Sequence, residues 1–508
     1  MNKPKLVIGR IVVTVLLIIL ELLWILALFD RLQPYIGGIE AVMRAVSVVI
    51  VICMISMSRH YSYNIMWIVI ILAFPLTGTV VFLFLEVMDR VSSKTYKNIV
   101  SETEKSQKYL EQDADVLDAA RADAPDIAGQ FTYISESSGF PFYENTGFDY
   151  YGFGEEGWPV MLEEMKKAEK FIFLEYFIIA PGKMWEPMLE ILQEKAQEGV
   201  LCRVLYDDMG SINKLPYDYA RQLEEMGIHA VAFNRISPVL NGIMNHRDHR
   251  KILVIDGKVA FSGGINLSDE YINVNSPFGI WKDNCIRVTG KAVWSYTVLF
   301  LTNWNALRHE DDDYRIYEAQ DVRPGSPDGW IAPYGETPLD DRLLGQDIYI
   351  NILNQARNYC YIFSPYLLID NEMLNALILA AQRGVDVRII LPGIPDKKIV
   401  WNIAKTYFYN LAHNGVKIYL YTPGFDHAKV FVSDDRVATV GTLNLDYRSL
   451  YLHFENGTYL YKAKEILKIR DDFLEAAEQS HEIRMGESRL HPLRAFFYMA
   501  LRILTPMM

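Results

Sequence analysis

The chain has 508 residues, 51% of them hydrophobic and 22% charged, so it is long enough for two or three folding units and too apolar for global disorder. Its formal net charge of −13 at pH 7 argues against a nucleic-acid partner, because phosphate backbones are bound by clusters of Lys and Arg. Its four cysteines lack CxxC spacing, which favours neither a zinc site nor a disulfide framework. The composition therefore predicts a large folded protein without a structural metal.

Three apolar runs lie near the N-terminus, at residues 11–29, 45–57 and 65–85. About 20 apolar residues are needed to cross a bilayer, and the first and third runs reach that length. A cleaved signal peptide explains the first run less well, because no small-residue cleavage site follows it and further apolar runs do. Residues 1–90 are therefore expected to be a transmembrane anchor with two or three apolar segments.

Positive residues flank this anchor on both sides, and positive charge marks the cytoplasmic face of a membrane. They are Lys3, Lys5 and Arg10 before the first run, and Arg90, Lys94 and Lys97 after the third. An even number of crossings satisfies both flanks, with one run re-entrant or interfacial, whereas three crossings would place the rest of the chain outside. We expect two crossings in a multi-pass protein of the cell membrane, with the large domain on the cytoplasmic face.

Two further segments differ in composition from the rest of the chain. Residues 91–134 are rich in Glu, Asp, Lys, Gln and Ala in their central part and predict an exposed helical linker. Residues 486–508 carry apolar side chains at helical spacing with two arginines among them. Such a segment is typical of an interfacial amphipathic helix, and equally of a helix packed on the protein's own core.

Between these segments, short apolar runs alternate with helix-like stretches, a pattern that predicts an α/β fold with a mostly parallel or mixed sheet. The runs lie at residues 171–179, 202–207, 251–256, 361–369, 387–392 and 429–432.

The series of runs occurs twice. Residues 172–177 match 362–367, residues 196–203 match 381–388, and His249-x-Lys251-x4-Asp256 matches His427-x-Lys429-x4-Asp434. Three matches in the same order exceed chance and indicate an internal duplication. We expect two α/β lobes, at residues 135–325 and 326–485.

Each copy of the last motif places a histidine and a lysine two residues apart at a strand-like run. Residues i and i+2 share a face of a strand, so His249 and Lys251 should project together, as should His427 and Lys429. If the lobes are related by a pseudo-twofold axis, both pairs meet at one interface between them.

An aspartate closes each motif, and an asparagine follows it. Asp256 precedes a glycine, which is a typical hairpin-turn pair, and Asp434 stands at the matching position. Both aspartates belong to the candidate catalytic motif, although turn formation is the preferred interpretation of each. Asn266 and Asn444 follow their histidines by 17 residues in both copies and are candidate substrate-binding residues.

Two His, two Lys and two Asn suit chemistry at a phosphodiester. One imidazole can attack phosphorus while the other protonates the leaving oxygen. The ammonium and amide groups can stabilise charge on the non-bridging oxygens. This chemistry requires no metal and no cofactor.

The doubled HxKx4D, followed by GGxN in one copy and GTxN in the other, resembles the phospholipase D superfamily. The N-terminal apolar runs and the stretches FIFLEYFII, NHRDHRKI, SPYLLID and NLDYRSL resemble the bacterial cardiolipin synthases in particular. The resemblance implies two α/β lobes with the active site between them. It also implies that His249 becomes a phosphohistidine carrying a phosphatidyl group, while His427 serves as acid and then as base.

The resemblance further implies an acidic residue that holds the second nitrogen of each histidine. Glu455 matches this position in the second lobe, where it would serve His427. Asp283 is the best match in the first lobe, where it would serve His249 at a longer spacing.

The implied reaction joins two phosphatidylglycerol molecules into cardiolipin and glycerol within the membrane. Hydrolysis, transfer to another alcohol, a nuclease and a non-catalytic membrane scaffold are the alternatives. The sequence carries no signal of oligomeric state.

Overall fold

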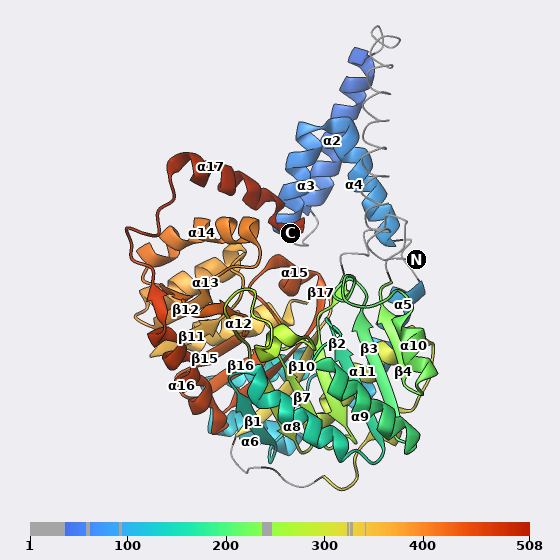
Figure 1. Cartoon of the computed structure of the whole chain (residues 1–508). Coiled ribbons are helices and arrows are strands. Elements are labelled where there is room, and N and C mark those ends of the chain that lie inside the picture. The colour runs from blue at the N-terminus through green and yellow to red at the C-terminus, as the bar shows by residue number, and fades with distance from the viewer. Residues whose placement is uncertain are drawn as a thin grey trace.

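Each copy of the repeated apolar pattern builds one β-sheet, and the two sheets form the body of the molecule (Figure 1). The computed structural model describes residues 36–56, 61–90, 94–235, 246–322, 325, 329–340 and 342–507. The apolar runs become strands because their β-branched and aromatic side chains are buried on both faces of a sheet. The predicted α/β class and its duplication are confirmed.

The first lobe contains seven strands of one sheet and the helices around it. The strands are β1 (Gly147–Tyr151), β2 (Phe171–Tyr176), β3 (Leu201–Asp207), β4 (His229–Phe233), β6 (Lys251–Ile255), β7 (Val259–Gly263) and β9 (Cys285–Thr289). The helices are α8 (Gly154–Lys166), α9 (Trp185–Gln197), α10 (Tyr219–Glu225) and α11 (Val293–Arg308), with short turns η4 (Asp269–Ile272) and η5 (Tyr314–Tyr317). The strand order is β1-β9-β7-β6-β2-β3-β4. Strand β2 pairs in parallel with β3 and antiparallel with β6, so the sheet is mixed.

The second lobe repeats this plan with its own strands and helices. The strands are β10 (Trp330–Glu336), β11 (Tyr359–Phe363), β12 (Asp386–Pro392), β13 (Lys417–Tyr421), β15 (Val430–Ser433), β16 (Val437–Gly441), β17 (His453–Tyr461) and β18 (Ser480–Glu482). The helices are α12 (Leu344–Gln355), α13 (Asn371–Gln382), α14 (Lys398–His413), α15 (Tyr447–Tyr451) and α16 (Glu465–Glu478). The strand order is β10-β17-β16-β15-β11-β12-β13-β18.

The lobes share one hydrophobic core. Alternate side chains of β2 face opposite ways, so Phe171 and Phe173 join a cluster that continues into the second lobe, whereas Ile172 and Leu174 join a second cluster, made up of first-lobe residues and Phe425. Helix α11 lies in the shared cluster, where Phe300 stacks on Phe173 with ring centroids 4.6 Å apart. The two lobes therefore pack as one body, and their interface can hold side chains in fixed positions.

One short strand of each lobe pairs with a strand of the other lobe. In the first lobe, β5 (Arg247–Asp248) pairs in parallel with β17 of the second. In return, β14 (Gly424–Asp426) of the second lobe pairs in parallel with β8 (Ile280–Lys282) of the first. These reciprocal pairs lie directly before the two histidines of the repeated motif.

The segment expected to be an exposed linker is helical but packs on the core, so that part of the prediction is wrong. It contains α5 (Lys94–Ser106), η1 (Gln107–Tyr109), α6 (Ala114–Asp123), α7 (Ala128–Thr132) and η2 (Tyr133–Ser137). Polar residues dominate its composition, but those that are apolar lie on one face of the helices. Tyr96, Ile99, Leu117 and Phe131 are buried in the shared core for that reason.

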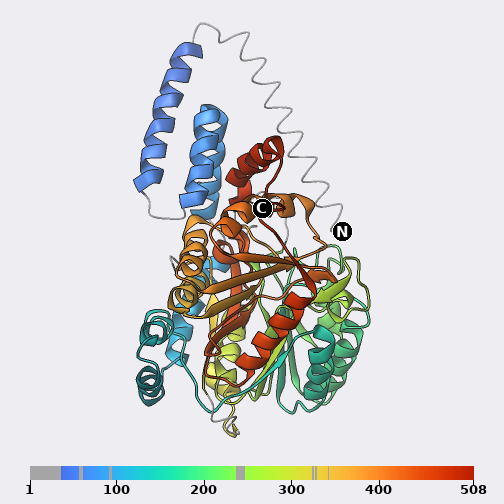
Figure 2. The same cartoon turned by 90° about the vertical axis from the view of Figure 1, so that its left-hand side faces the viewer.

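Three N-terminal helices project from one end of the molecule (Figures 1 and 2). They are α2 (Ile36–Ser56), α3 (Tyr61–Ala73) and α4 (Pro75–Arg90). Among the residues that the structure describes, no helix combines the length and hydropathy needed to span a membrane. The first apolar run, residues 11–29, lies outside the described residues.

The third apolar run does not form one straight helix. It bends between α3 and α4, and the rings of Trp67 and Phe82 then meet with centroids 5.4 Å apart. Pro75 begins the second helix, and Gly78 lets the backbones approach, since a Cβ there would lie 2.8 Å from the carbonyl oxygen of Ile70. The run, expected to be one apolar segment, is thus two helices that pack on each other.

The C-terminal segment forms α17 (Pro492–Leu501) and η6 (Arg502–Met507). No residue of α17 is buried, and Leu493 and Phe496 are 76% and 74% exposed. Packing of this helix into the protein's own core, one of the two expected alternatives, is therefore wrong. The following turn η6 contacts both α3 and α15, and so joins the N-terminal helices to the second lobe.

Candidate active site between the lobes

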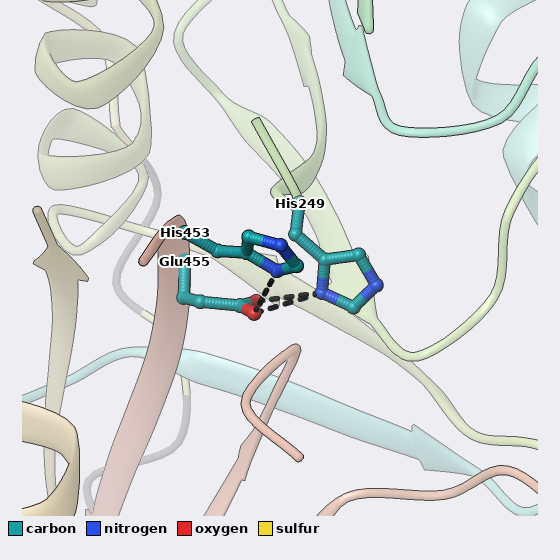
Figure 3. Close-up of side chains that lie close together, drawn as sticks. All are labelled: His249, His453 and Glu455. Carbon is teal, nitrogen blue, oxygen red and sulfur yellow. Dashed lines mark hydrogen bonds and ion pairs between the residues drawn. The ribbon is translucent and has the colours of Figure 1, made fainter. Parts of the chain in front are cut away.

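The first-lobe histidine is held by the second lobe. Because β5 pairs with β17, the backbone N–H of His249 donates to the carbonyl oxygen of Phe454 at 2.8 Å. The next residue of β17 is Glu455, and its carboxylate oxygens lie 2.8 and 2.9 Å from His249 Nδ1 (Figure 3). A carboxylate at Nδ1 fixes the proton there and leaves the lone pair on Nε2.

The second-lobe histidine is held by the first lobe in the same way. Pairing of β14 with β8 brings the backbone N–H of His427 to the carbonyl oxygen of Lys282 at 2.7 Å. His427 Nδ1 then lies 2.6 Å from Asp283 Oδ2.

The expected pairing of each histidine with the carboxylate of its own lobe is therefore wrong. Both carboxylates are at the site, but they are exchanged between the lobes. The reason is that each histidine follows a short strand whose hydrogen-bonding partner belongs to the other sheet. The spacing between each histidine and the carboxylates in the sequence does not indicate that exchange.

The two lysines lie against their histidines: Lys251 begins β6, and Lys429 directly precedes β15. Lys251 Nζ donates to the carbonyl oxygen of His249 at 2.7 Å, and Lys429 Nζ lies 2.8 Å from His427 Nδ1. The histidines themselves precede β6 and β15 rather than lying on them. All four side chains are buried, with relative exposures of 0 to 7%.

Burial shifts the ionisation of these groups toward their neutral forms. It lowers the pKa of His427 to about 4, with a smaller contribution from Lys429, and it places the pKa of His249 well below its ordinary value. Burial also lowers the pKa of Lys251 to about 7 and that of Lys429 to about 8. A site that disfavours its own positive charges would be stabilised by a bound anion.

Glu455 and Asp283 differ in the donor that accompanies the histidine: Asp283 accepts the backbone N–H of Asn284 at 2.8 Å, whereas Glu455 accepts a hydroxyl group. Thr442 Oγ1 donates to Glu455, in addition to His249, and burial raises the pKa of its carboxyl group well above the ordinary value. In the first lobe the position that matches Thr442 is Gly264, where a Cβ would lie 1.9 Å from Asp283 Oδ1. The two histidines thus have unequal surroundings.

Asp256 and Asp434 form turns away from the histidines. Asp256 accepts backbone N–H groups of residues 169, 170 and 171 at 2.8 Å each. Asp434 accepts those of residues 357, 358 and 359 at 2.7 to 2.9 Å. Both adopt a left-handed backbone conformation, with φ of 53° and 55°. Both carboxylates are therefore engaged in turns, and this turn interpretation replaces their assignment to the candidate catalytic residues.

The two asparagines differ in how much of their side chain is already bonded. Asn266 accepts from the backbone N–H of Ile178 at 3.1 Å and donates to the hydroxyl group of Tyr271 at 2.6 Å. The side-chain oxygen of Asn444 is buried and has no hydrogen-bond partner among the described residues. Their proposed contact with substrate remains a prediction, and Asn444 has the more available polar atom.

Sequence reasoning missed one residue of the site, His453. Its ring lies 5.5 Å from that of His249, and it stands two residues before Glu455 on β17. That spacing on a strand is the signal that could have identified it. The ligand atoms of His249, His453 and Glu455 lie within 4.8 Å of one another, close enough for a metal ion, but Lys251 beside them opposes a dication.

The arrangement can perform nucleophilic and acid–base chemistry on an anionic substrate. Each histidine has its Nδ1 bonded to a carboxylate, so Nε2 is the reactive nitrogen in both. Two lysines stand beside them as cations for a phosphate group. One imidazole can attack while the other transfers a proton.

Comparison with known proteins places the same motifs in two repeated units. Residues 161–288 and 349–476 each match the family model described as cardiolipin synthase, PLD-like domain. An uncharacterized protein of Streptococcus mutans is 47% identical over 417 residues, which cover 82% of this chain and 90% of that protein.

A cardiolipin synthase of Alkalihalophilus pseudofirmus is 31% identical over 483 residues, which cover 94% of this chain and 95% of that protein. The crystal structure of phosphatidylserine synthase from Haemophilus influenzae superposes with a TM-score of 0.55 at 14% identity. The superposition covers 71% of this chain and 95% of that structure. At 14% identity this similarity shows a shared fold alone.

Proposed function

This chain belongs to the cardiolipin synthase family of phospholipase D-like proteins, and from that premise we propose that it joins two phosphatidylglycerol molecules through a phosphohistidine. The observation that carries the proposal is the reciprocal pairing of His249 with Glu455 and of His427 with Asp283. It presents two imidazoles with the same tautomer at one interface, which a two-step displacement requires.

In the first step, Nε2 of His249 attacks the phosphorus of one phosphatidylglycerol. The bond from phosphorus to the glycerol oxygen breaks, and the protonated His427 gives its Nε2 proton to that oxygen, so glycerol leaves. Burial lowers the pKa of His427 to about 4 in the substrate-free protein. The negative charge of the phosphodiester raises that pKa on binding and allows the ring to be charged when it acts as an acid.

In the second step, the neutral His427 accepts a proton from a glycerol hydroxyl group of the second phosphatidylglycerol. The oxygen attacks phosphorus, and the bond between phosphorus and His249 breaks. Cardiolipin leaves, His249 regains its lone pair, and His427 again carries the proton. Lys251 and Lys429 offset the charge on the phosphoryl oxygens in both steps.

The proposal includes attachment to the lipid bilayer that holds both substrates. Helices α2, α3, α4 and α17 lie at the same end of the molecule (Figures 1 and 2). Their exposed apolar side chains include Ile52, Ile55, Leu72, Leu493 and Phe496, which favour contact with lipid.

The half-site of His249 and Glu455 lies on the side of the body that meets this apolar end. Turn η6 contacts α15, and α15 leads directly into β17, which carries Glu455. We infer that the site faces the cytoplasmic surface of a multi-pass anchor.

A product assay tests the reaction. Purified full-length protein is incubated with phosphatidylglycerol in detergent, and lipids and glycerol are quantified. We expect cardiolipin and glycerol in equal amounts. Phosphatidic acid as the main product would show a hydrolase, and transfer to an added alcohol in place of phosphatidylglycerol would show a different acceptor.

The orientation is tested separately with Lys105→Cys, a position on α5 whose side chain is 49% exposed. A membrane-impermeant thiol reagent should label this cysteine only after the cells are opened. Labelling of intact cells would place the catalytic lobes outside.

A further inference from the structure

The half-site around His249 contains a third imidazole that the mechanism above does not use. His453 begins β17 and shares a strand face with Glu455. Its Nδ1 lies 3.6 Å from Glu455 Oε1, while His249 Nδ1 approaches the same carboxylate at 2.8 Å (Figure 3). One carboxylate therefore stands between two imidazole rings.

His453 is buried without a hydrogen bond of its own. Its side chain is 8% exposed, and neither ring nitrogen has a hydrogen-bond partner among the described residues. Leaving a polar group buried and unbonded costs free energy. Glu455 Oε1 lies 3.6 Å from Nδ1 and can accept from it.

The matching position of the other half-site is Trp281, whose indole N–H is also buried without a hydrogen-bond partner among the described residues. Trp281 stands two residues before Asp283, and its ring lies 5.5 Å from that of His427. His453 stands at the same distance, 5.5 Å, from His249. No hydrogen bond or ion pair joins Trp281 to Asp283 in the described structure. The two copies thus keep an aromatic ring at this place, but only one copy makes it an imidazole.

Burial and the charges around His453 keep its ring neutral. Burial, followed by the positive charges of Arg448, Arg247 and Lys251, holds its pKa well below the ordinary value. A neutral imidazole retains one N–H donor, and it can point that donor at a carboxylate.

Resting on the proposed function, we propose that His453 is a positioning residue whose Nδ1–H donates to Glu455 and holds that carboxylate, ionised, against His249. The observed separation of 3.6 Å exceeds a normal hydrogen bond, and such contacts commonly tighten when substrate is bound. Burial raises the pKa of Glu455 well above its ordinary value, so each donor to the ionised form counts. Loss of the His453 donor raises that pKa further and lets Glu455 protonate at a higher pH.

The test compares His453→Phe, which keeps a ring without a donor, with His453→Asn, which keeps an N–H near the place of Nδ1. The pH dependence of kcat/KM is measured for full-length enzyme in phosphatidylglycerol micelles. His453→Phe should lower kcat/KM about tenfold at pH 7, as expected for a hydrogen bond to a charged group. Its acidic limb should move to higher pH, and His453→Asn should restore most of both.

A matched control is His246→Gln, which alters a partly buried histidine that bonds the carbonyl oxygen of Leu452 rather than Glu455. Its acidic limb should stay in place. Equal effects of His453→Phe and His453→Asn, or a loss that does not depend on pH, would overturn the proposal. So would micromolar Zn²⁺ binding that His453→Asn abolishes, because the imidazole would then be a metal ligand.

Failure of the proposed function gives a different result. Wild-type enzyme would then form no cardiolipin, and the same variants would be compared through release of a fluorescent headgroup from a labelled phospholipid. The ratio between His453→Phe and His453→Asn decides the role of His453 in either reaction.

Discussion

The two half-sites share a backbone plan and differ in the side chains that complete it. Around His249 stand Glu455, Thr442 and His453. Around His427 the matching residues are Asp283, Gly264 and Trp281. The duplication therefore preserved the histidine and its carboxylate, while the residues around them diverged.

This difference suggests a division of labour between the histidines. The longer carboxylate with a hydroxyl donor suits a ring that must carry a covalent phosphatidyl group through two steps. The smaller, apolar-flanked half-site suits a ring that only exchanges a proton. Substitutions in the two half-sites test whether the two histidines differ in chemical role as much as they differ in surroundings.

Replacement of either histidine has the largest expected effect. His249→Ala and His427→Ala should each reduce cardiolipin formation at least about a thousandfold, because each removes a group essential to both steps. The two variants should differ in the intermediate. With a short-chain phosphatidyl ester of p-nitrophenol, whose leaving group departs without an acid, His427→Gln should form the acid-labile adduct on His249 but lack the base that resolves it, and mass spectrometry of the peptide would locate the adduct.

An adduct on His427 in the reciprocal variant, His249→Gln, would reverse the assignment. Unchanged turnover in either alanine variant would refute the two-histidine mechanism altogether. Circular dichroism of each variant serves as the control for folding.

Replacement of the carboxylates comes next. Glu455→Gln and Asp283→Asn should each lower kcat roughly a hundredfold or more, since an amide can stabilise the wrong tautomer of the histidine it contacts. The cross-lobe geometry makes a sharper claim. The double variant Glu455→Gln with His249→Ala should have the same kcat as His249→Ala alone, because Glu455 acts through His249. If each carboxylate instead served the histidine of its own lobe, Glu455→Gln would have no further effect in the His427→Ala background.

The lysines set an expected alkaline limit. Burial lowers the pKa of Lys251 to about 7 and that of Lys429 to about 8, and only the charged forms stabilise the phosphoryl oxygens. Because the lysines lose their charge in this range, kcat/KM should fall as pH rises through about 7 to 8. In Lys251→Arg the guanidinium stays charged, so the remaining limb should shift toward the value set by Lys429.

If the alkaline fall in kcat/KM occurred at the same pH in both Lys251→Arg and Lys429→Arg, a group other than these lysines would be responsible for it. Activity in the arginine variants is expected to be lower at every pH, because a larger cation occupies a buried place. The position of the limb, rather than its height, is the quantity to compare.

The turn aspartates have the smallest expected effect on chemistry. Asp256→Asn and Asp434→Asn weaken three backbone hydrogen bonds each, and about 1–3 kcal/mol of stability should be lost. The loss should be larger at Asp256, which is 6% exposed, than at the half-buried Asp434. Thermal unfolding measures this, and kcat of the folded enzyme should be nearly unchanged. A large fall in kcat without a fall in Tm would return them to the catalytic set.

Much of this site was predictable because its signals are local. The His and Lys spacing, the Asp turn with its left-handed residue, and the buried strands β2 and β6 all depend on neighbours within a few residues. The repetition of these signals predicted two lobes. Composition gave the wrong prediction for residues 91–134. Polar residues predominate there on average, but the helices have one apolar face that packs on the core.

By itself, the sequence determined that two copies of a His-Lys motif stand on strand-like segments of a duplicated α/β chain. Only the tertiary structure decided which carboxylate serves which histidine, because that choice depends on β5 pairing with β17 and β14 with β8. Those partners are separated by more than a hundred residues, and hydrogen bonds between backbones leave no mark on side-chain spacing. The same pairing placed His453 beside His249, so the unequal chemistry of the two half-sites is a property of the fold.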